Sequence, residues 1–218
     1  MNNKKPKRIG VLLSSKDNRI KNDIWEVVLL YYFLELNNLH VLNIVPPTIE
    51  LSGELRSELV DAGYSLGDFV VADREVGKEI AGLFIPTFDK SIIASGSDIH
   101  PKDDIRIDND LRRFVREVFR RRKPIAASGL GAFFLAVAIS DITESSVSLT
   151  VGNDPIIESY LERRECNTIN TRGGEVIIDE TNHLITTAGH YCERKIKTVF
   201  KGLENLVAGF VHLKNSGA

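Results

Sequence analysis

The sequence has little cysteine and no marked excess of charge of either sign. It holds only two cysteines, Cys166 and Cys192, which are too few for a disulfide scaffold or an all-cysteine zinc site. The formal net charge is −2, and sequence-independent binding to nucleic acid depends on many phosphate contacts. We therefore expect no nucleic-acid partner and a reducing, cytoplasmic compartment.

Long apolar runs are also missing. Residues 1–8 are polar and basic, and the apolar run that follows, Ile9–Leu13, is too short for the core of a signal peptide. No stretch approaches the ~18 apolar residues that a membrane span requires. We expect a soluble protein without a membrane contact, in which residues 1–7 are disordered.

Motifs for cofactors and metals are absent from the sequence as well. There is no P-loop and no Gly-x-Gly-x-x-Gly motif, so nucleotide binding has no support. Four histidines show no metal-ligand spacing: His40, His100, His183 and His212. We expect neither a cofactor nor a metal, and the only ligand left to consider is a small molecule.

What the chain does contain is ordinary globular composition and a regular alternation of elements. Hydrophobic residues make up 43 % and charged residues 27 % of the 218 residues, which favours one folded domain spanning 1–218. The predicted strands are 8–13, 40–45, 69–72, 81–85, 124–128 and 147–151, with a hairpin of 175–179 and 183–187, and the predicted helices are 23–37, 51–64, 108–122, 131–139, 154–163 and 191–213. This order predicts a doubly wound α/β fold, with a mostly parallel sheet, helices on both faces and a small β-hairpin near the C-terminus.

One helix is rich in arginine. Acidic residues open the segment 108–122 and arginines close it, as the helix dipole favours. We interpret its arginines as a solvated face and as partners of the dipole: Arg112, Arg113, Arg116, Arg120, Arg121 and Arg122.

The segment Ile125–Ala132 is the best candidate for chemistry. It has the pattern of a strand, a sharp turn and a helix start, and ligands of such sheets bind at the carboxyl ends of the strands. A nucleophile elbow has this layout, with one strained residue above a helix N-terminus that favours an anion. A plain tight connection between strand and helix needs glycines for the same backbone reasons, so spacing leaves both interpretations open.

Several further segments form a pattern together with this elbow: 9–14, Lys123-Pro124, 125–131 with Leu135, 149–154, 176–182 and 185–187. Together they resemble the ThiJ/PfpI superfamily, whose fold is similar to class I glutamine amidotransferases, and within it the ElbB-like proteins. These proteins have been called isoprenoid biosynthesis proteins with an amidotransferase-like domain. The resemblance implies an amidotransferase-like, flavodoxin-like sandwich and a homodimer.

The departures from the family pattern concern the site itself. The family places a cysteine at the elbow, where the motif puts Gly129, which has no nucleophile. It also places a Gly-Gly pair after the strand that ends at Pro86, where this chain has Thr87 and Phe88. The resemblance thus implies an elbow and anion pocket made of Gly129, Leu130, Gly131, Thr87 and Phe88, in which both the attacking atom and the oxyanion loop are altered.

Four further residues are candidates for the same site. Glu26 matches the acid that hydrogen-bonds the family's cysteine, although Asp23-Ile24-Trp25-Glu26 also has the pattern of a capped helix start. Ser128 is a possible replacement nucleophile, with His190 as its base and Cys192 beside it on the pocket rim. The alternatives are a packed strand end for Ser128, an exposed residue for His190 and a small packing residue for Cys192.

Two functions follow from these observations. The first is a pseudoenzyme, a non-catalytic binding or regulatory protein that keeps the cleft as a small-molecule pocket. The second is an enzyme that acts on a small carbonyl or acyl substrate, glyoxalase- or hydrolase-like, with Ser128 as a displaced nucleophile or with Glu26 as general base. A Ser–His or Cys–His contact near Gly129 would favour the enzyme.

Overall fold

The computed structural model describes residues 8–16, 19–20, 22–47, 68–89, 105 and 107–216. Its main sheet has seven strands in the order β10-β11-β7-β6-β1-β4-β5. All neighbouring strands of this sheet are parallel except the pair β10–β11, which is antiparallel. The strands are β1 (Ile9–Leu12), β4 (Val41–Val45), β5 (Asp68–Val71), β6 (Gly82–Ile85), β7 (Ile125–Ser128), β10 (Val176–Asp179) and β11 (Leu184–Thr187).

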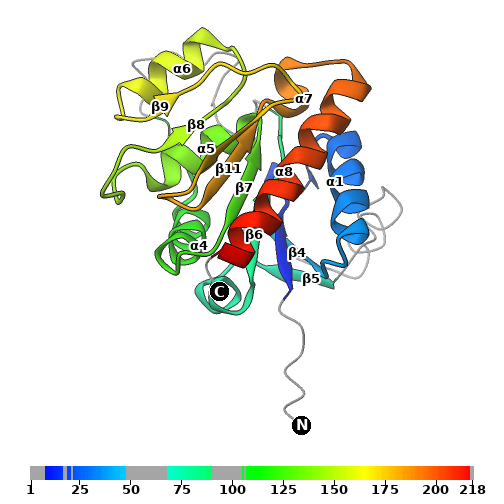
Figure 1. Cartoon of the computed structure of the whole chain (residues 1–218). Coiled ribbons are helices and arrows are strands. Elements are labelled where there is room, and N and C mark those ends of the chain that lie inside the picture. The colour runs from blue at the N-terminus through cyan, green and yellow to red at the C-terminus, as the bar shows by residue number, and fades with distance from the viewer. Residues whose placement is uncertain are drawn as a thin grey trace.

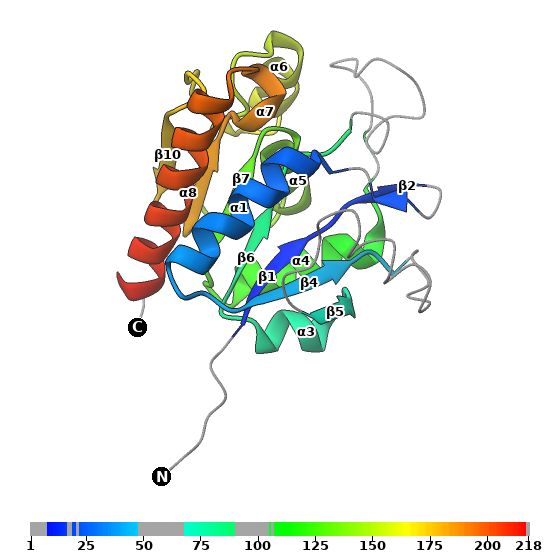
Figure 2. The same cartoon turned by 90° about the vertical axis from the view of Figure 1, so that its right-hand side faces the viewer.

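Helices cover both faces of this sheet (Figures 1 and 2). On one face lie α1 (Ile24–Leu36) and α8 (Ile196–Ser216), side by side; on the other lie α4 (Asn109–Arg120) and α5 (Leu130–Ile139). Successive strand residues pack on opposite faces: Leu83 and Ile85 contribute to the core under α4 and α5, and Phe84 to the core under α1 and α8. Burial on both faces explains why these strands are continuously apolar in sequence. The doubly wound α/β prediction is confirmed, including the hairpin.

The remaining elements lie around this sandwich. They are the pair β2 (Ser15–Lys16) and β3 (Arg19–Ile20), the pair β8 (Ser148–Leu149) and β9 (Asn167–Thr168), and the helices α3 (Arg74–Glu79), α6 (Pro155–Glu162) and α7 (Gly189–Cys192). Side chains of aspartate cap α1, α4 and α6 at Asp23, Asp108 and Asp154. No helix in the described part of the chain is long and apolar enough to cross a membrane.

The structure differs from the sequence-based assignment in a few places. The predicted final helix 191–213 is divided into α7 and α8, because Glu193 adopts an extended conformation and its side chain accepts hydrogen bonds from the N–H groups of Arg194 and Lys195. The strand predicted over 147–151 is reduced to β8, and α3 was not predicted. The predicted helix 51–64 and the predicted disorder of 1–7 lie outside the described residues.

Candidate functional site

The turn between β7 and α5 has the backbone geometry of an elbow. Gly129 has φ +49° and ψ −122°, a conformation in which side chains are strained and glycine is favoured. Its N–H donates to the Thr187 carbonyl at 2.9 Å, and its carbonyl accepts from the Ala132 N–H at 3.1 Å. The turn is therefore fixed at both ends, as a nucleophile elbow requires.

The space above this turn is already filled. A Cβ atom built on Gly129 would lie 2.4 Å from Thr87 Oγ1 and 2.7 Å from Tyr191 Cβ. Both distances are far shorter than a van der Waals contact, so these atoms occupy the volume that a side chain at the elbow would need. The Thr87 side chain therefore fits in this place only because residue 129 is a glycine without a side chain.

The two backbone donors that would form an oxyanion hole, the N–H groups of Leu130 and Thr87, are both already hydrogen-bonded within the protein. In elbow enzymes one donor is the N–H of the residue after the nucleophile, and a loop after another strand provides the second. Here the Leu130 N–H donates to Thr87 Oγ1 at 3.1 Å. The Thr87 N–H donates to Glu26 Oε1 at 2.8 Å and to Ser128 Oγ at 3.1 Å. Both donors are directed at groups of the protein itself.

Glu26 lies buried beneath the pocket and joins three elements. Only 1 % of the residue is exposed, and its carboxyl group accepts hydrogen bonds from the Thr87 N–H, from the Ser128 hydroxyl and, at 2.8 Å, from the His190 N–H. Desolvation by burial raises the pKa of Glu26 above its usual value, and the hydrogen bonds oppose this only in part. Asp23, not Glu26, caps α1 by accepting the Glu26 N–H at 3.0 Å.

The candidate nucleophile and base do not meet in the described part of the chain. Ser128 is 1 % exposed, and its hydroxyl donates to Glu26. The His190 ring lies against Asp23 instead, with Nδ1 2.5 Å from Oδ2. The Cys192 thiol donates to the Val151 carbonyl at 3.4 Å. A serine activated by His190 is therefore not assembled here.

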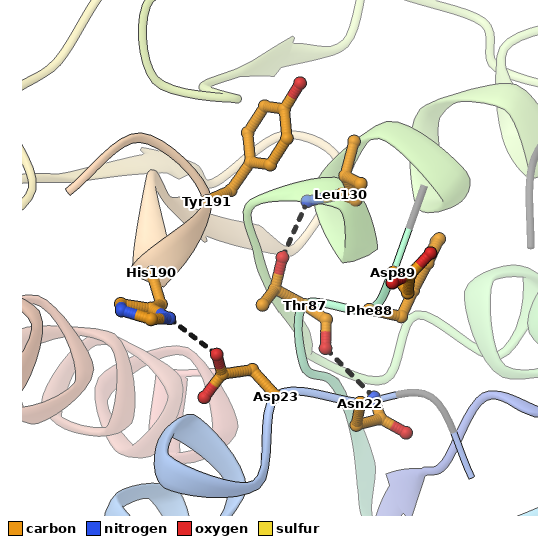
Figure 3. A pocket seen from close by; sticks show the side chains of 8 residues that line it. All are labelled: Asn22, Asp23, Thr87, Phe88, Asp89, Leu130, His190 and Tyr191. Carbon is orange, nitrogen blue, oxygen red and sulfur yellow. Dashed lines mark hydrogen bonds and ion pairs between the residues drawn. The ribbon is translucent and has the colours of Figure 1, made fainter. Parts of the chain in front are cut away.

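A cavity of about 330 Å³, which we name the elbow pocket, opens over these residues at the carboxyl ends of the strands (Figure 3). It is lined by Asn22, Asp23, Thr87, Phe88, Asp89, Leu130, His190 and Tyr191. Sequence reasoning named four of them: Thr87, Phe88, Leu130 and His190. Gly129, Gly131, Glu26, Ser128 and Cys192 are not among the lining residues.

Sequence reasoning missed the other four lining residues as members of the site. Asp23 and Asp89 are each close in sequence to a named candidate, and Tyr191 follows His190. These three residues could therefore have been predicted as neighbours of the candidates. Asn22 holds two loops together: its side chain accepts the Ser14 N–H at 2.7 Å and donates to the Thr87 carbonyl at 3.1 Å. Its role depends on contacts far apart in the sequence.

The charge of the lining is mostly negative. The lining holds two carboxylates, Asp23 and Asp89, and one imidazole, His190, which pairs with Asp23. The buried Glu26 accepts the His190 N–H. Phe88 and Tyr191 supply aromatic surface. In the described residues no group of three histidine, cysteine, aspartate or glutamate side chains is placed to hold a metal ion. The cavity can therefore offer acceptors and aromatic faces, while its nearest backbone donors are already engaged.

Several solved structures share this fold. An isoprenoid biosynthesis protein with an amidotransferase-like domain from Ehrlichia chaffeensis has a TM-score of 0.75 at 17 % identity, over 95 % of this chain and 99 % of that one. An inferred protease I from Bacteroides thetaiotaomicron has a TM-score of 0.54 at 13 % identity, over 92 % and 99 %. An AraC family transcriptional regulator from Pseudomonas putida has a TM-score of 0.54 at 13 % identity, over 97 % of each chain.

No family model and no curated protein matches this sequence. The structural likeness, at these identities, shows the fold: a flavodoxin-like, amidotransferase-like sandwich with an antiparallel strand pair near its C-terminus.

Proposed function

We propose that this chain is an ElbB-like member of the ThiJ/PfpI superfamily that binds a small molecule at the elbow and lacks the family's cysteine chemistry. The fold it shares with an amidotransferase-like isoprenoid biosynthesis protein supports the membership. The observation that carries the proposal is the occupation of the elbow: Thr87 Oγ1 lies where a side chain at Gly129 would begin. A pocket without its attacking atom can still bind.

The state of the oxyanion donors supports the same conclusion. Loss of a single such donor in an active enzyme costs ~10²–10³ in rate. Here both the Leu130 and the Thr87 N–H groups donate within the protein. A developing oxyanion would have to displace the Thr87 hydroxyl and the buried Glu26 carboxyl before it received any stabilisation.

The lining favours a small neutral or cationic ligand over an anion. Its volume of about 330 Å³ lies at the lower end of the ~300–1,000 Å³ of ligand pockets, which suits a metabolite of a few carbon atoms. Carboxylates such as Asp23 and Asp89 attract an amine, and an ammonium group is also stabilised by aromatic faces such as Phe88 and Tyr191.

The proposal is tested by a thermal-stability screen with small amines, polyols, aldehydes and carboxylates. A ligand that binds only the native state stabilises it by RT ln(1 + [L]/Kd), or ~2.7 kcal/mol at a hundredfold excess over Kd. We expect amines or polyols to raise Tm, with a smaller rise in Asp89→Asn. The control is Glu144→Gln, which changes an exposed carboxylate that is not part of the cavity lining. Equal binding by wild type and Asp89→Asn would place the ligand elsewhere.

The alternative is an enzyme that acts on a small carbonyl or acyl substrate, and one contact favours it. The Ser128 hydroxyl donates to Glu26, whose pKa is raised by burial, and a carboxylate with a raised pKa is a better base. Turnover of a small activated ester that is lost in Ser128→Ala but kept in Cys192→Ala would establish this activity and overturn the first proposal.

We further propose that the protein assembles as a homodimer through an apolar face of α1 and α8. Four exposed side chains lie along α1 at helical spacing and two along α8: Trp25, Val28, Tyr32 and Leu36, with Ile196 and Phe200. We name these six residues the α1–α8 apolar face. The rings of Tyr32 and Phe200 are 6.3 Å apart, so the two helices contribute to one continuous patch.

The size of the α1–α8 apolar face fits a second copy of the chain. Trp25 is 70 % exposed and Leu36 is 60 % exposed. With ~150–250 Å² for a whole aromatic side chain, the face leaves several hundred Å² of apolar surface, which approaches the ~800 Å² per partner of a standard interface. A two-fold pair buries the same face on both copies.

Light scattering tests the homodimer. We expect wild type to have twice the mass of the 24.3 kDa chain, and Trp25→Glu or Tyr32→Glu to be monomeric. The matched control is Ile156→Glu, since Ile156 is an exposed isoleucine on α6 outside this face. A wild-type monomer would contradict the proposal. We also propose that the protein is located in the cytoplasm, which its two free thiols, Cys166 and Cys192, support.

A further inference from the structure

A second cavity is lined by residues of α4 and α5 and by residues that directly follow α5 and α6. Figure 1 shows that these three helices are neighbours. The cavity has a volume of about 360 Å³. Two apolar residues line it, Ile105 and Val137, together with three arginines: Arg112 of α4, and Arg163 and Arg164, which follow α6. We name it the arginine cavity. It shares no residue with the elbow pocket.

Arg112 has an unusual position and an unusual hydrogen-bonding state. It lies near the start of α4, which begins at Asn109, where the helix dipole disfavours a cation. Its Nε is buried and has no hydrogen-bond partner among the described residues. A buried polar group without a partner lowers the stability of the folded state. In the described structure no hydrogen bond to Arg112 Nε compensates for this loss.

The other two arginines of the cavity form no ion pair with any carboxylate in the described part of the chain. The Arg164 guanidinium stacks over the Tyr160 ring at 3.8 Å from the centroid. That stacking fixes the orientation of the group before any ligand arrives. Arg163 follows α6, is exposed, and forms no ion pair with the described residues.

Two acidic residues also line the arginine cavity, and they do not neutralise it. Asp141 forms an ion pair with Arg116, a further arginine that caps α5 by donating to the Ala138 carbonyl at 2.7 Å. Glu165 lies at the rim and is exposed. The C-terminal ends of α5 and α6 attract cations and so account for Arg116 and Arg164. They do not account for Arg112, because this residue lies near the N-terminal end of α4.

We propose that the arginine cavity binds a small phosphorylated molecule. Arginine presents a planar fork of donors that matches phosphate oxygens, and three arginine residues line this cavity together with Ser140. A phosphate at this position is attracted by the three positive charges, and Ile105 and Val137 contact the carbon part of the ligand. The site is separate from the elbow and holds whether or not the elbow binds a ligand.

Calorimetry with pyrophosphate as the probe tests this site, at constant ionic strength set with potassium chloride. We expect wild type to bind pyrophosphate and Arg112→Gln to bind it at least tenfold more weakly, since one charge-assisted, bidentate contact is lost. The matched control is Arg113→Gln. Arg113 is the next residue of the same helix, 71 % exposed and paired with Asp110, so its loss removes the same charge outside the cavity.

Two results would overturn the site. One is the absence of pyrophosphate binding to wild type at millimolar concentration. The other is an equal loss of affinity in Arg112→Gln and Arg113→Gln, which would mean general attraction to a basic surface. Arg163→Gln covers the case in which Arg112→Gln does not fold, because Arg163 is exposed. It should also bind more weakly than Arg113→Gln.

Discussion

The elbow pocket and the arginine cavity treat their hydrogen-bonding groups in opposite ways. At the elbow, the N–H groups of Thr87, Leu130 and His190 all donate to side chains of the protein. In the arginine cavity, the Nε of Arg112 is buried without a partner in the described structure. The first arrangement supports our proposal of a pocket without catalytic chemistry, and the second supports our proposal of an anion site.

The elbow network can be broken at its centre, where we expect the largest effect. Glu26→Ala removes the acceptor of three groups, and each buried donor left without a partner costs ~1–3 kcal/mol. We therefore expect a loss of about 3 kcal/mol in the free energy of unfolding, measured by urea denaturation. Glu26→Gln keeps the size and one carbonyl acceptor and should lose less. Equal stability of Glu26→Ala and wild type would contradict the network.

The second largest effect is expected when a side chain is introduced at Gly129, next to Thr87. Gly129→Cys places a Cβ atom 2.4 Å from Thr87 Oγ1 at φ +49°, and overpacking of this kind costs about 1–3 kcal/mol. We expect lower stability and little labelling of the new thiol by a small reagent, beyond the labelling of Cys192 in wild type.

A double variant sharpens the same point. Gly129→Cys with Thr87→Gly removes the clash and returns a glycine to the oxyanion loop, so the new thiol should label readily above the helix N-terminus of α5. The single variant Thr87→Gly serves as the control for labelling of Cys192. Equal labelling of the single Gly129→Cys and the double variant would show that Thr87 does not block the elbow.

The pH dependence of stability should show the buried carboxyl group of the elbow. The pKa of Glu26 is raised in the folded state above its usual value of 4.5, so the folded state binds this proton more tightly than the unfolded state. Its contribution to stability is complete below about pH 4.5 and is lost as the pH rises through the folded pKa. In urea denaturation, Glu26→Gln should lack this decline, and an identical pH profile in both proteins would contradict it.

We expect the smallest effect on stability from a substitution in the arginine cavity. Without ligand, Arg112→Gln should leave the free energy of unfolding within about 0.5 kcal/mol of wild type or raise it, because the buried Nε makes no hydrogen bond to lose. Denaturation with urea, with and without pyrophosphate, gives this comparison. A large loss without ligand would show that Arg112 has a structural partner.

The fold could be predicted because its signals are local or periodic. The caps at Asp23, Asp108 and Asp154, the apolar strands and the turn at Gly129 all lie within short segments. The break between α7 and α8 was missed because it depends on the conformation of one residue, Glu193.

The site could be predicted only in part, because its contacts join distant segments. The pairing of Thr87 with Leu130 spans 43 positions, and that of Glu26 with His190 spans 164. The interpretation of the arginines as a solvated face holds for Arg113, which is 71 % exposed. It fails for Arg112, whose Nε is buried, and for Arg116, whose guanidinium donates to the Ala138 carbonyl of α5. Such positions follow from helix packing, which periodicity alone does not specify.

The central claim is that the elbow binds without catalysing, and turnover of methylglyoxal tests it most directly. Purified wild type should show no rate above the control without enzyme, because no thiol lies at Gly129 and Thr87 occupies that space. The assay should include Ser128→Ala and Cys192→Ala, prepared in the same way. A wild-type rate that disappears in either variant would contradict the account.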